Sequence, residues 1–256
     1  MSHNDLLSAL SDELDDAYAV KVEEIQKLEN FASLHQSDRN TDEIALGIFR
    51  KAQIMLLYAH FEGFCKFVLQ CYVIYINKEC VSIQDLKHGL LASCLEGAFN
   101  KLTDSQHKPV KIKAELKDDK VLQVLGRRRE FLCAYNDTVK DIASINEDLC
   151  VDTESNLWAH TLKKLMYKLE LTYDIVAEFQ GDVNSLLHLR NAYAHGGRDK
   201  PPTEQEYTDY KKTVFMLMKR LRDEIQSSFS NRAYLTSPSY ASAVVETSSE
   251  FVRAGE

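Results

Sequence analysis

One long apolar segment, residues 44–77, constrains the fold more than any other part of the chain. It reads IALGIFRKAQIMLLYAHFEGFCKFVLQCYVIYIN, and its apolar side chains recur around most of the circumference of a helix. A helix of this kind must be covered by neighbouring elements on several sides. Polar residues interrupt the run, so no window approaches the ~18 uninterrupted apolar residues of a membrane-spanning helix. The segment therefore predicts the central helix of a soluble bundle without membrane contact.

Periodic apolar residues predict further helices on both sides of this segment. Residues 5–34 form one amphipathic pattern, and Thr203 with Glu206 makes a capping box for a last helix that ends near residue 228. The other predicted helices cover residues 84–102, 118–126, 128–146, 154–170 and 182–195, with a connector or short helix at 171–180.

Only 9 glycines and 4 prolines occur in the chain, which disfavours turn-rich β architectures. We therefore expect an all-α fold with one domain, residues 1–228. Residues 229–256 are rich in serine and alanine and have no helical stripe, so we expect a flexible tail.

The charge is distributed unevenly. The chain has a net charge of −8, and residues 1–30 contain eight acidic residues against two lysines. The rest is therefore close to neutral, and its basic clusters are candidates for contacts with RNA phosphates. These clusters contain Arg127, Arg128, Arg129, Lys163 and Lys164. Solvated helix faces are the alternative interpretation of each cluster.

Six cysteines occur without a CxxC pair and without a secretory leader. This pattern predicts reduced thiols and a cytoplasmic protein. Metal-ligand spacing is also missing from the sequence, so we expect no bound metal and no cofactor.

The segment 186–197, LLHLRNAYAHGG, carries the candidate chemistry. Arg190 and Asn191 interrupt an apolar helix stripe, and His195 directly precedes two glycines. An unpaired guanidinium beside a core is costly, so Arg190 must meet a carboxylate, a phosphate or water. Glu62 is one available carboxylate. In the alternative interpretation these two residues form a buried structural pair, and His195 only ends a helix.

RNAYAHGG fits the Arg-Asn-x-x-x-His pattern and resembles the HEPN superfamily of helical ribonucleases (higher eukaryote and prokaryote nucleotide-binding domains). LLYAHFEGFCKFVL is similar to the long central helix of its ribonuclease-L-like and phage-defence branch. The order of the segments agrees over residues 5–228, except at 103–150. The resemblance implies a HEPN-like helical bundle and a homodimer with a composite active site.

RNA carries its own nucleophile, the ribose 2′-OH, so cleavage needs proton transfer and positive charge at the phosphate. His195 suits the proton transfer near neutral pH, and Arg190 suits the developing charge. Asn191 and Glu62 complete the predicted catalytic set. Asn191 is expected to orient His195 or the phosphate, and Glu62 to position Arg190 or His195, with a structural pairing to Lys66 or to a buried partner as the alternative for Glu62. His188, on the same polar helix line as His195, joins the predicted RNA contacts, with a purely structural role as its alternative.

Three functions follow from these residues. The first is a metal-independent endoribonuclease, the toxic effector of a toxin-antitoxin or antiviral defence system with an antitoxin or defence partner. The second is a non-catalytic helical adaptor that binds RNA, a nucleotide or a partner protein. The third is a purely structural bundle in which Arg190 and Glu62 are fully buried together.

Overall fold

The computed structural model describes residues 1–36, 43–109, 119–154, 156–197 and 200–236. Within these ranges the chain forms nine α-helices, two short 3-10 helices and no strand. The predicted all-α fold is confirmed. None of the helices in the described ranges is long and apolar enough to cross a membrane.

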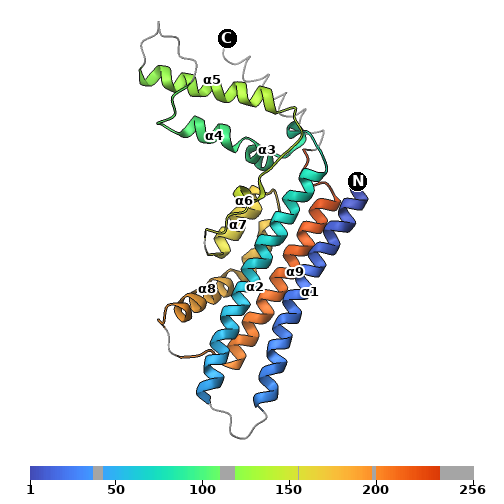
Figure 1. Cartoon of the computed structure of the whole chain (residues 1–256), viewed down its shortest axis with the longest axis vertical. Coiled ribbons are helices and arrows are strands. Elements are labelled where there is room, and N and C mark those ends of the chain that lie inside the picture. Colours follow the sequence, from blue (N-terminus) through green and yellow to red (C-terminus); the bar gives the residue numbers. More distant parts are fainter. Residues whose placement is uncertain (37–42, 110–118, 155, 198–199, 237–256) are drawn as a thin grey trace.

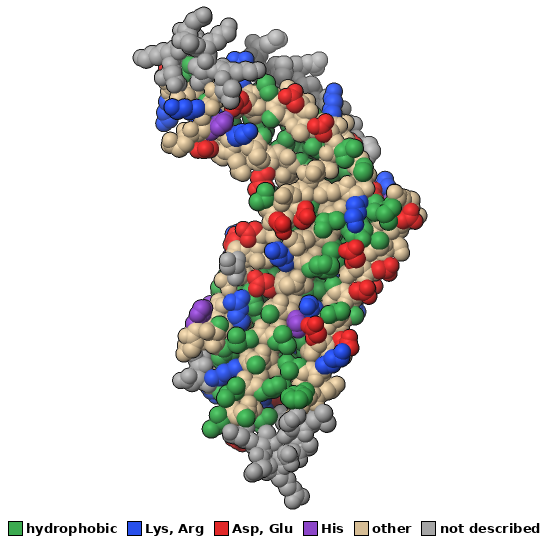
Figure 2. Space-filling view, viewed as in Figure 1, with side chains coloured by type: hydrophobic (Ala, Val, Ile, Leu, Met, Phe, Trp, Pro, Cys, Tyr) green, Lys and Arg blue, Asp and Glu red, His purple; other side chains and the backbone are tan. Residues whose placement is uncertain are grey.

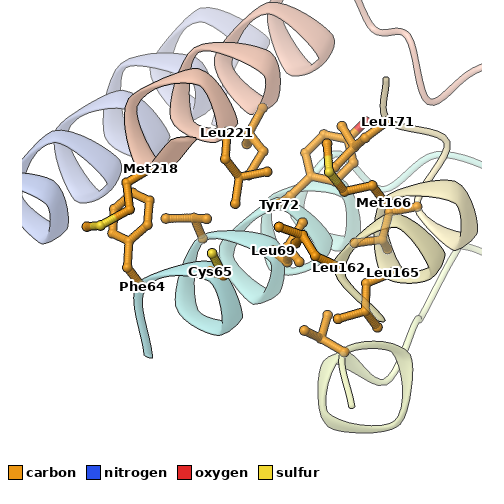
Figure 3. Packing of buried hydrophobic residues seen from close by; sticks show 14 of the residues in the cluster. Phe64, Cys65, Leu69, Tyr72, Leu162, Leu165, Met166, Leu171, Met218 and Leu221 are labelled. Carbon is orange, nitrogen blue, oxygen red and sulfur yellow. The ribbon is translucent and has the colours of Figure 1, made fainter. Parts of the chain in front are cut away.

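Three long helices run side by side and form the body of the molecule (Figure 1). They are α1 (His3–Gln36), α2 (Glu43–Lys78) and α9 (Glu204–Ser230). Figure 3 shows the side chains of α2 that meet α9 on one side and α7 (Ala159–Lys168) on the other. The labelled side chains of α2 are Phe64, Cys65, Leu69 and Tyr72; Met218 and Leu221 of α9 and Leu162, Leu165 and Met166 of α7 belong to the same core cluster. The predicted central helix is therefore confirmed in extent and in burial.

The ends of α9 follow partly from local sequence. The Glu206 N–H donates to Thr203 Oγ1 at 3.1 Å, and the Thr203 N–H donates to Glu206 Oε2 at 2.7 Å, so the predicted capping box is present. At the other end, α9 continues to Ser230, and Tyr234 beyond it is fully buried. The packed part therefore extends beyond residue 228. Residues 237–256, most of the predicted flexible tail, lie outside the described residues.

The prediction of one helix over residues 84–102 is wrong. This stretch forms a 3-10 turn, η1 (Ile83–Asp85), followed by α3 (His88–Cys94) and α4 (Glu96–Thr103). Leu86 takes an extended conformation because it pairs with Leu235 in an isolated β-bridge. This contact with a distant residue overrides the local helical preference.

The predictions for residues 118–146 are also wrong. One helix, α5 (Lys120–Thr138), replaces the two predicted helices, and Asp119 caps it by accepting from the Leu122 N–H at 2.9 Å. The chain then runs extended along a neighbour, where the Ala143 N–H donates to the Val81 carbonyl at 2.8 Å. A short helix, α6 (Glu147–Cys150), follows.

The remaining predicted helices form with shifted starts. The helix predicted at 154–170 begins only at Ala159 as α7, and residues 171–180 form the 3-10 helix η2 (Tyr173–Phe179). The motif helix is α8 (Gln180–Ala194). Figure 1 shows α8 beside the lower half of α2, whereas α4 and α5 form a hairpin at the opposite end of the molecule. The motif and this hairpin are therefore well separated.

Candidate active site

Helix α8 is anchored to the bundle by its apolar side chains. Val183, Leu186, Leu187 and Leu189 are buried in the core. The helix packs on α2 and on α9. This packing turns the next residue, Arg190, towards α2, and it leaves the C-terminal end of α8 in solvent.

The Arg190 side chain lies between three groups. Its guanidinium carbon is 4.4 Å from the centroid of the Tyr58 ring, and Nη2 is 3.5 Å from Glu62 Oε2. Nη1 donates to Asn191 Oδ1 at 2.8 Å. These two bonds use two of the five N–H donors of a guanidinium. The group is therefore oriented from three directions and keeps donors for a phosphate.

The predicted partnership of Arg190 with Glu62 is present, but the pair is not fully buried. The Arg190 side chain is 24% exposed and the Glu62 side chain is 21% exposed. The fully buried pair required by a purely structural bundle is therefore not observed. Solvent, and a bound molecule, can reach the guanidinium.

Tyr58 is a further residue of the site, and it also belongs to the hydrophobic core. It is buried, and its hydroxyl oxygen accepts a hydrogen bond from the Leu157 N–H at 2.8 Å. Burial, together with the nearby Glu62 carboxylate, raises the pKa of Tyr58 to about 12. The tyrosine stays protonated at neutral pH and acts as a platform for Arg190. In the sequence, Tyr58 lies four residues before Glu62 on the same predicted helix, and this spacing was the signal that could have identified Tyr58 as part of the site.

His195 stands at the C-cap of α8, and the two glycines explain its place. Gly196 has φ of +69°, which glycine adopts without strain, and the Gly197 N–H donates to the Ala192 carbonyl at 2.8 Å. This is the Schellman arrangement, which ends a helix at once. The His195 residue is exposed. The glycine pair thus stops the helix directly after the histidine and leaves its ring at the surface.

Four polar residues, Asn184, His188, Asn191 and His195, follow one another along one side of α8, and they divide into two pairs. Asn184 Oδ1 accepts from the Ala159 N–H at 3.1 Å, and the His188 ring lies edge-on to Trp158 with centroids 4.9 Å apart. These contacts hold the start of α7 against α8. The second pair, Asn191 and His195, lies nearer the end of the helix. Trp158, the only tryptophan in the chain, was not singled out from the sequence.

The predicted RNA-contact residues fall on two separate surfaces. Lys163 and Lys164 lie on α7, which packs on α8; Lys163 Nζ donates to Gln180 Oε1 at 2.7 Å. Arg127, Arg128 and Arg129 lie on α5, at the end of the molecule away from α8 (Figure 1). The structure therefore places Lys163 beside the first residue of α8, at the opposite end of that helix from Arg190 and His195, and it places the three arginines on a different part of the molecule.

Comparison with known proteins adds the family. The sequence model of the RiboL-PSP-HEPN family matches residues 16–227, which include α2, α8 and nearly all of α9. No curated protein and no solved structure matches the chain. HEPN domains are generally RNase domains. Since the match covers far more than half of its length, the chain belongs to the RiboL-PSP-HEPN family.

Proposed function

We propose that this protein is a metal-independent endoribonuclease with Arg190 and His195 in its active site. The observation that carries the proposal is the pairing of a half-buried, oriented guanidinium with an exposed histidine on the same short helix. Membership of a family of HEPN domains supports the reaction class. RNA is the proposed substrate.

The chemistry requires no group beyond those of the protein and the RNA. The 2′-oxygen attacks the adjacent phosphorus while a histidine accepts its proton, and the bond between phosphorus and the 5′-oxygen breaks as that oxygen takes up a proton. The products carry a 2′,3′-cyclic phosphate and a 5′-hydroxyl. Arg190 donates to the phosphate oxygens, whose charge grows in the transition state. Asn191 and Glu62 position Arg190 through the contacts described above.

A single chain presents these groups on different sides of α8. Arg190 and His195 are five positions apart, which corresponds to about 140° around an ideal helix. Two copies related by a two-fold axis bring the arginine of one protomer towards the histidine of the other. We therefore propose a homodimer with a composite active site.

One face of α2 fits the contact between the two copies. Its exposed residues recur every three or four positions and are apolar or small; they are Ile48, Ala52, Met55, Ala59, Gly63 and Phe67. We call this face the α2 seam. Small residues allow two helix backbones to approach closely, and exposed apolar faces mark association surfaces. The seam adjoins Glu62, so packing two seams together brings both Arg190 groups near the two-fold axis.

Figure 2 shows the same region on the molecular surface. Hydrophobic side chains gather over the lower half of the visible face, where α2 and α8 lie in Figure 1. Ile48 is 63% exposed and Phe67 is 42% exposed. These side chains would be removed from water in the proposed dimer, which stabilises association.

We further propose that the nuclease is the toxic effector of a toxin-antitoxin or antiviral defence system and is restrained by an antitoxin or a defence partner. The resemblance of LLYAHFEGFCKFVL to the phage-defence branch supports this role. Induced expression in bacteria tests it. The parent arrests growth, and His195→Ala does not; equal growth of both cultures would remove the support for a toxic role.

The reaction is tested with purified protein, end-labelled RNA and a buffer that contains EDTA. The parent cleaves, whereas His195→Ala and Arg190→Ala do not. His160→Ala, which changes an exposed histidine on α7, is the matched control and cleaves as the parent does. RNA with a single 2′-deoxy position is not cut there. If both motif variants cut as fast as the parent, the proposal fails.

The non-catalytic adaptor has one observation in its favour, since Arg190 is already engaged by Glu62 and Asn191. The same assay separates the two functions. If the parent protein binds the labelled RNA without producing fragments, and Arg190→Ala no longer binds it, the protein is an adaptor.

A further inference from the structure

A cavity of about 560 Å³ lies between α4 and α5, in the hairpin at the far end from the motif helix. Binding sites for small organic molecules have volumes of about 300–1,000 Å³. The cavity therefore has the size of a ligand site. The proposed RNA chemistry does not use it.

The walls of the cavity are largely apolar. Ala98 of α4, together with Phe131 and Ala134 of α5, supplies aliphatic and aromatic surface. Phe131 also packs against Phe99, with ring centroids 4.8 Å apart, and this contact joins the two helices. Gly97 lines the cavity, and a Cβ added there would meet no atom within 4 Å. Such walls favour the apolar body of a ligand.

The polar groups of the cavity carry an excess of positive charge. Lys101, Arg127 and Arg129 line it, together with Glu130. The Glu130 carboxylate is engaged by His107, with Oε2 at 2.8 Å from Nε2. Cationic groups therefore outnumber the carboxylate, and an anion is the ligand charge that fits.

Arg127 supplies a specific donor. Its Nη1 donates to the His107 carbonyl at 3.3 Å, which orients the guanidinium. Its Nε is buried and finds no acceptor among the described residues. A buried donor without an acceptor is unfavourable, which marks this guanidinium as incompletely satisfied within the described part of the chain. Arg127 lines the cavity, so an anion there would meet the guanidinium through its other nitrogens. Arg128, the next residue, is exposed and does not line the cavity.

We propose that the cavity between α4 and α5 binds a small organic anion, with its apolar body against Ala98, Phe131 and Ala134 and its phosphate or carboxylate on Arg127. This assigns Arg127 to a ligand pocket and separates it from Arg128, which lies on the surface. The site is independent of the proposed nuclease chemistry, since it lies on the hairpin and not on α8.

Calorimetric titration of the full chain tests the proposal with three probes that share one ring system. They are 1-naphthyl phosphate, 1-naphthoate and the neutral 1-naphthol. At least one anion binds saturably with one site per chain. The anion that binds more tightly shows whether the site prefers a phosphate or a carboxylate. The neutral probe binds at least tenfold more weakly. If neither anion binds saturably, or if 1-naphthol binds as tightly as the better anion, the proposal is overturned.

Two variants locate the binding. Arg127→Met removes the donors and weakens the better anion at least tenfold, whereas the matched control Arg128→Met binds it as the parent does. Lys101→Met changes an exposed residue on the opposite wall, and it also weakens the anion. Thermal unfolding of each variant confirms that it is folded. Equal affinities in Arg127→Met and Arg128→Met, or an unchanged affinity in Lys101→Met, would place the anion elsewhere.

The failure of this proposal is distinguishable from failure of the nuclease proposal. His195→Ala binds the anion as the parent does, because His195 is on α8 and remote from the hairpin. Loss of RNA cleavage with intact anion binding therefore concerns only the motif. Loss of anion binding in Arg127→Met concerns only the cavity.

Discussion

The guanidinium of Arg190 lies over the ring of Tyr58, with 4.4 Å between the guanidinium carbon and the ring centroid. This contact joins the motif helix α8 to the central helix α2. The same tyrosine accepts a hydrogen bond from the Leu157 N–H, at the segment that leads into α7. One buried side chain therefore holds together three parts of the candidate site.

Tyr58→Phe separates the two roles of this tyrosine. The ring under Arg190 remains, but the buried Leu157 N–H loses its acceptor, which costs about 1–3 kcal/mol. We expect the free energy of unfolding in urea to fall by about this amount while RNA cleavage persists. Tyr58→Leu, which also removes the ring, should reduce cleavage. Equal cleavage by both variants would show that the ring does not position Arg190.

Gly196→Ala should destabilise the end of α8. Its φ of +69° lies in the left-handed region, which costs an L-residue about 1–2 kcal/mol. Gly197→Ala is the matched control, because its added Cβ makes only an ordinary contact, 3.8 Å from the Ala192 carbonyl oxygen. Urea unfolding of the two variants should therefore differ by about 1–2 kcal/mol. The same loss in both variants would contradict the Schellman ending.

Stability should fall in strongly basic solution. Burial raises the pKa of Tyr58 and of Cys71 to about 12, from ordinary values of 10.0 and 9.0. Between these values the unfolded chain loses protons that the folded chain keeps. The stabilisation is therefore complete below pH 9 and is lost as the pH rises towards 12. Urea unfolding at intervals from pH 8 to pH 11 measures it, and a flat profile would contradict the prediction.

Gly63→Arg tests the α2 seam. A Cβ at Gly63 meets no atom within 4 Å, so the protomer should fold normally. The long charged side chain should block a close approach of two α2 helices. We expect sedimentation to show monomers and RNA cleavage to be lost. Lys66→Arg, an exposed position one turn away, keeps its charge and serves as the control. A dimeric, active Gly63→Arg variant would place the interface elsewhere.

Mixing two inactive variants tests whether the site is shared between protomers. In a mixed dimer of His195→Ala with Arg190→Ala, one composite site keeps both an intact arginine and an intact histidine. Random exchange therefore restores about a quarter of the parent activity. If Arg190 and His195 act within one chain, the mixture stays as inactive as its components.

Local sequence was sufficient for the longest helices. The periodic apolar residues of 44–77 predicted α2 to within one residue at each end, and the Thr203 capping box marked the start of α9. These signals act between residues three or four positions apart, so they do not depend on the rest of the fold. Gly196, directly after His195, is a local signal of the same kind, because it marks the end of α8.

Long-range contacts decided the parts that the sequence did not predict. The backbone at Leu86 is extended because it pairs with Leu235, and residue 143 binds the carbonyl of residue 81. Helical propensity contains no information about such partners, because each lies tens of residues away. For that reason the helices predicted for residues 84–102 and 118–146 had the wrong boundaries.

The candidate site also depends partly on local sequence and partly on tertiary structure. The sequence by itself determined the all-α class and the central helix, and it showed that Arg190 needs a polar partner, for which Glu62 was one candidate, since an unpaired charge in an apolar stripe is costly. Only the tertiary structure decided that Arg190 pairs with Glu62 in a partly exposed position, that Tyr58 lies beneath Arg190, and that Arg127 lines a cavity far from α8. The physical reason is that burial and stacking depend on which helices pack together, and that choice belongs to the whole chain.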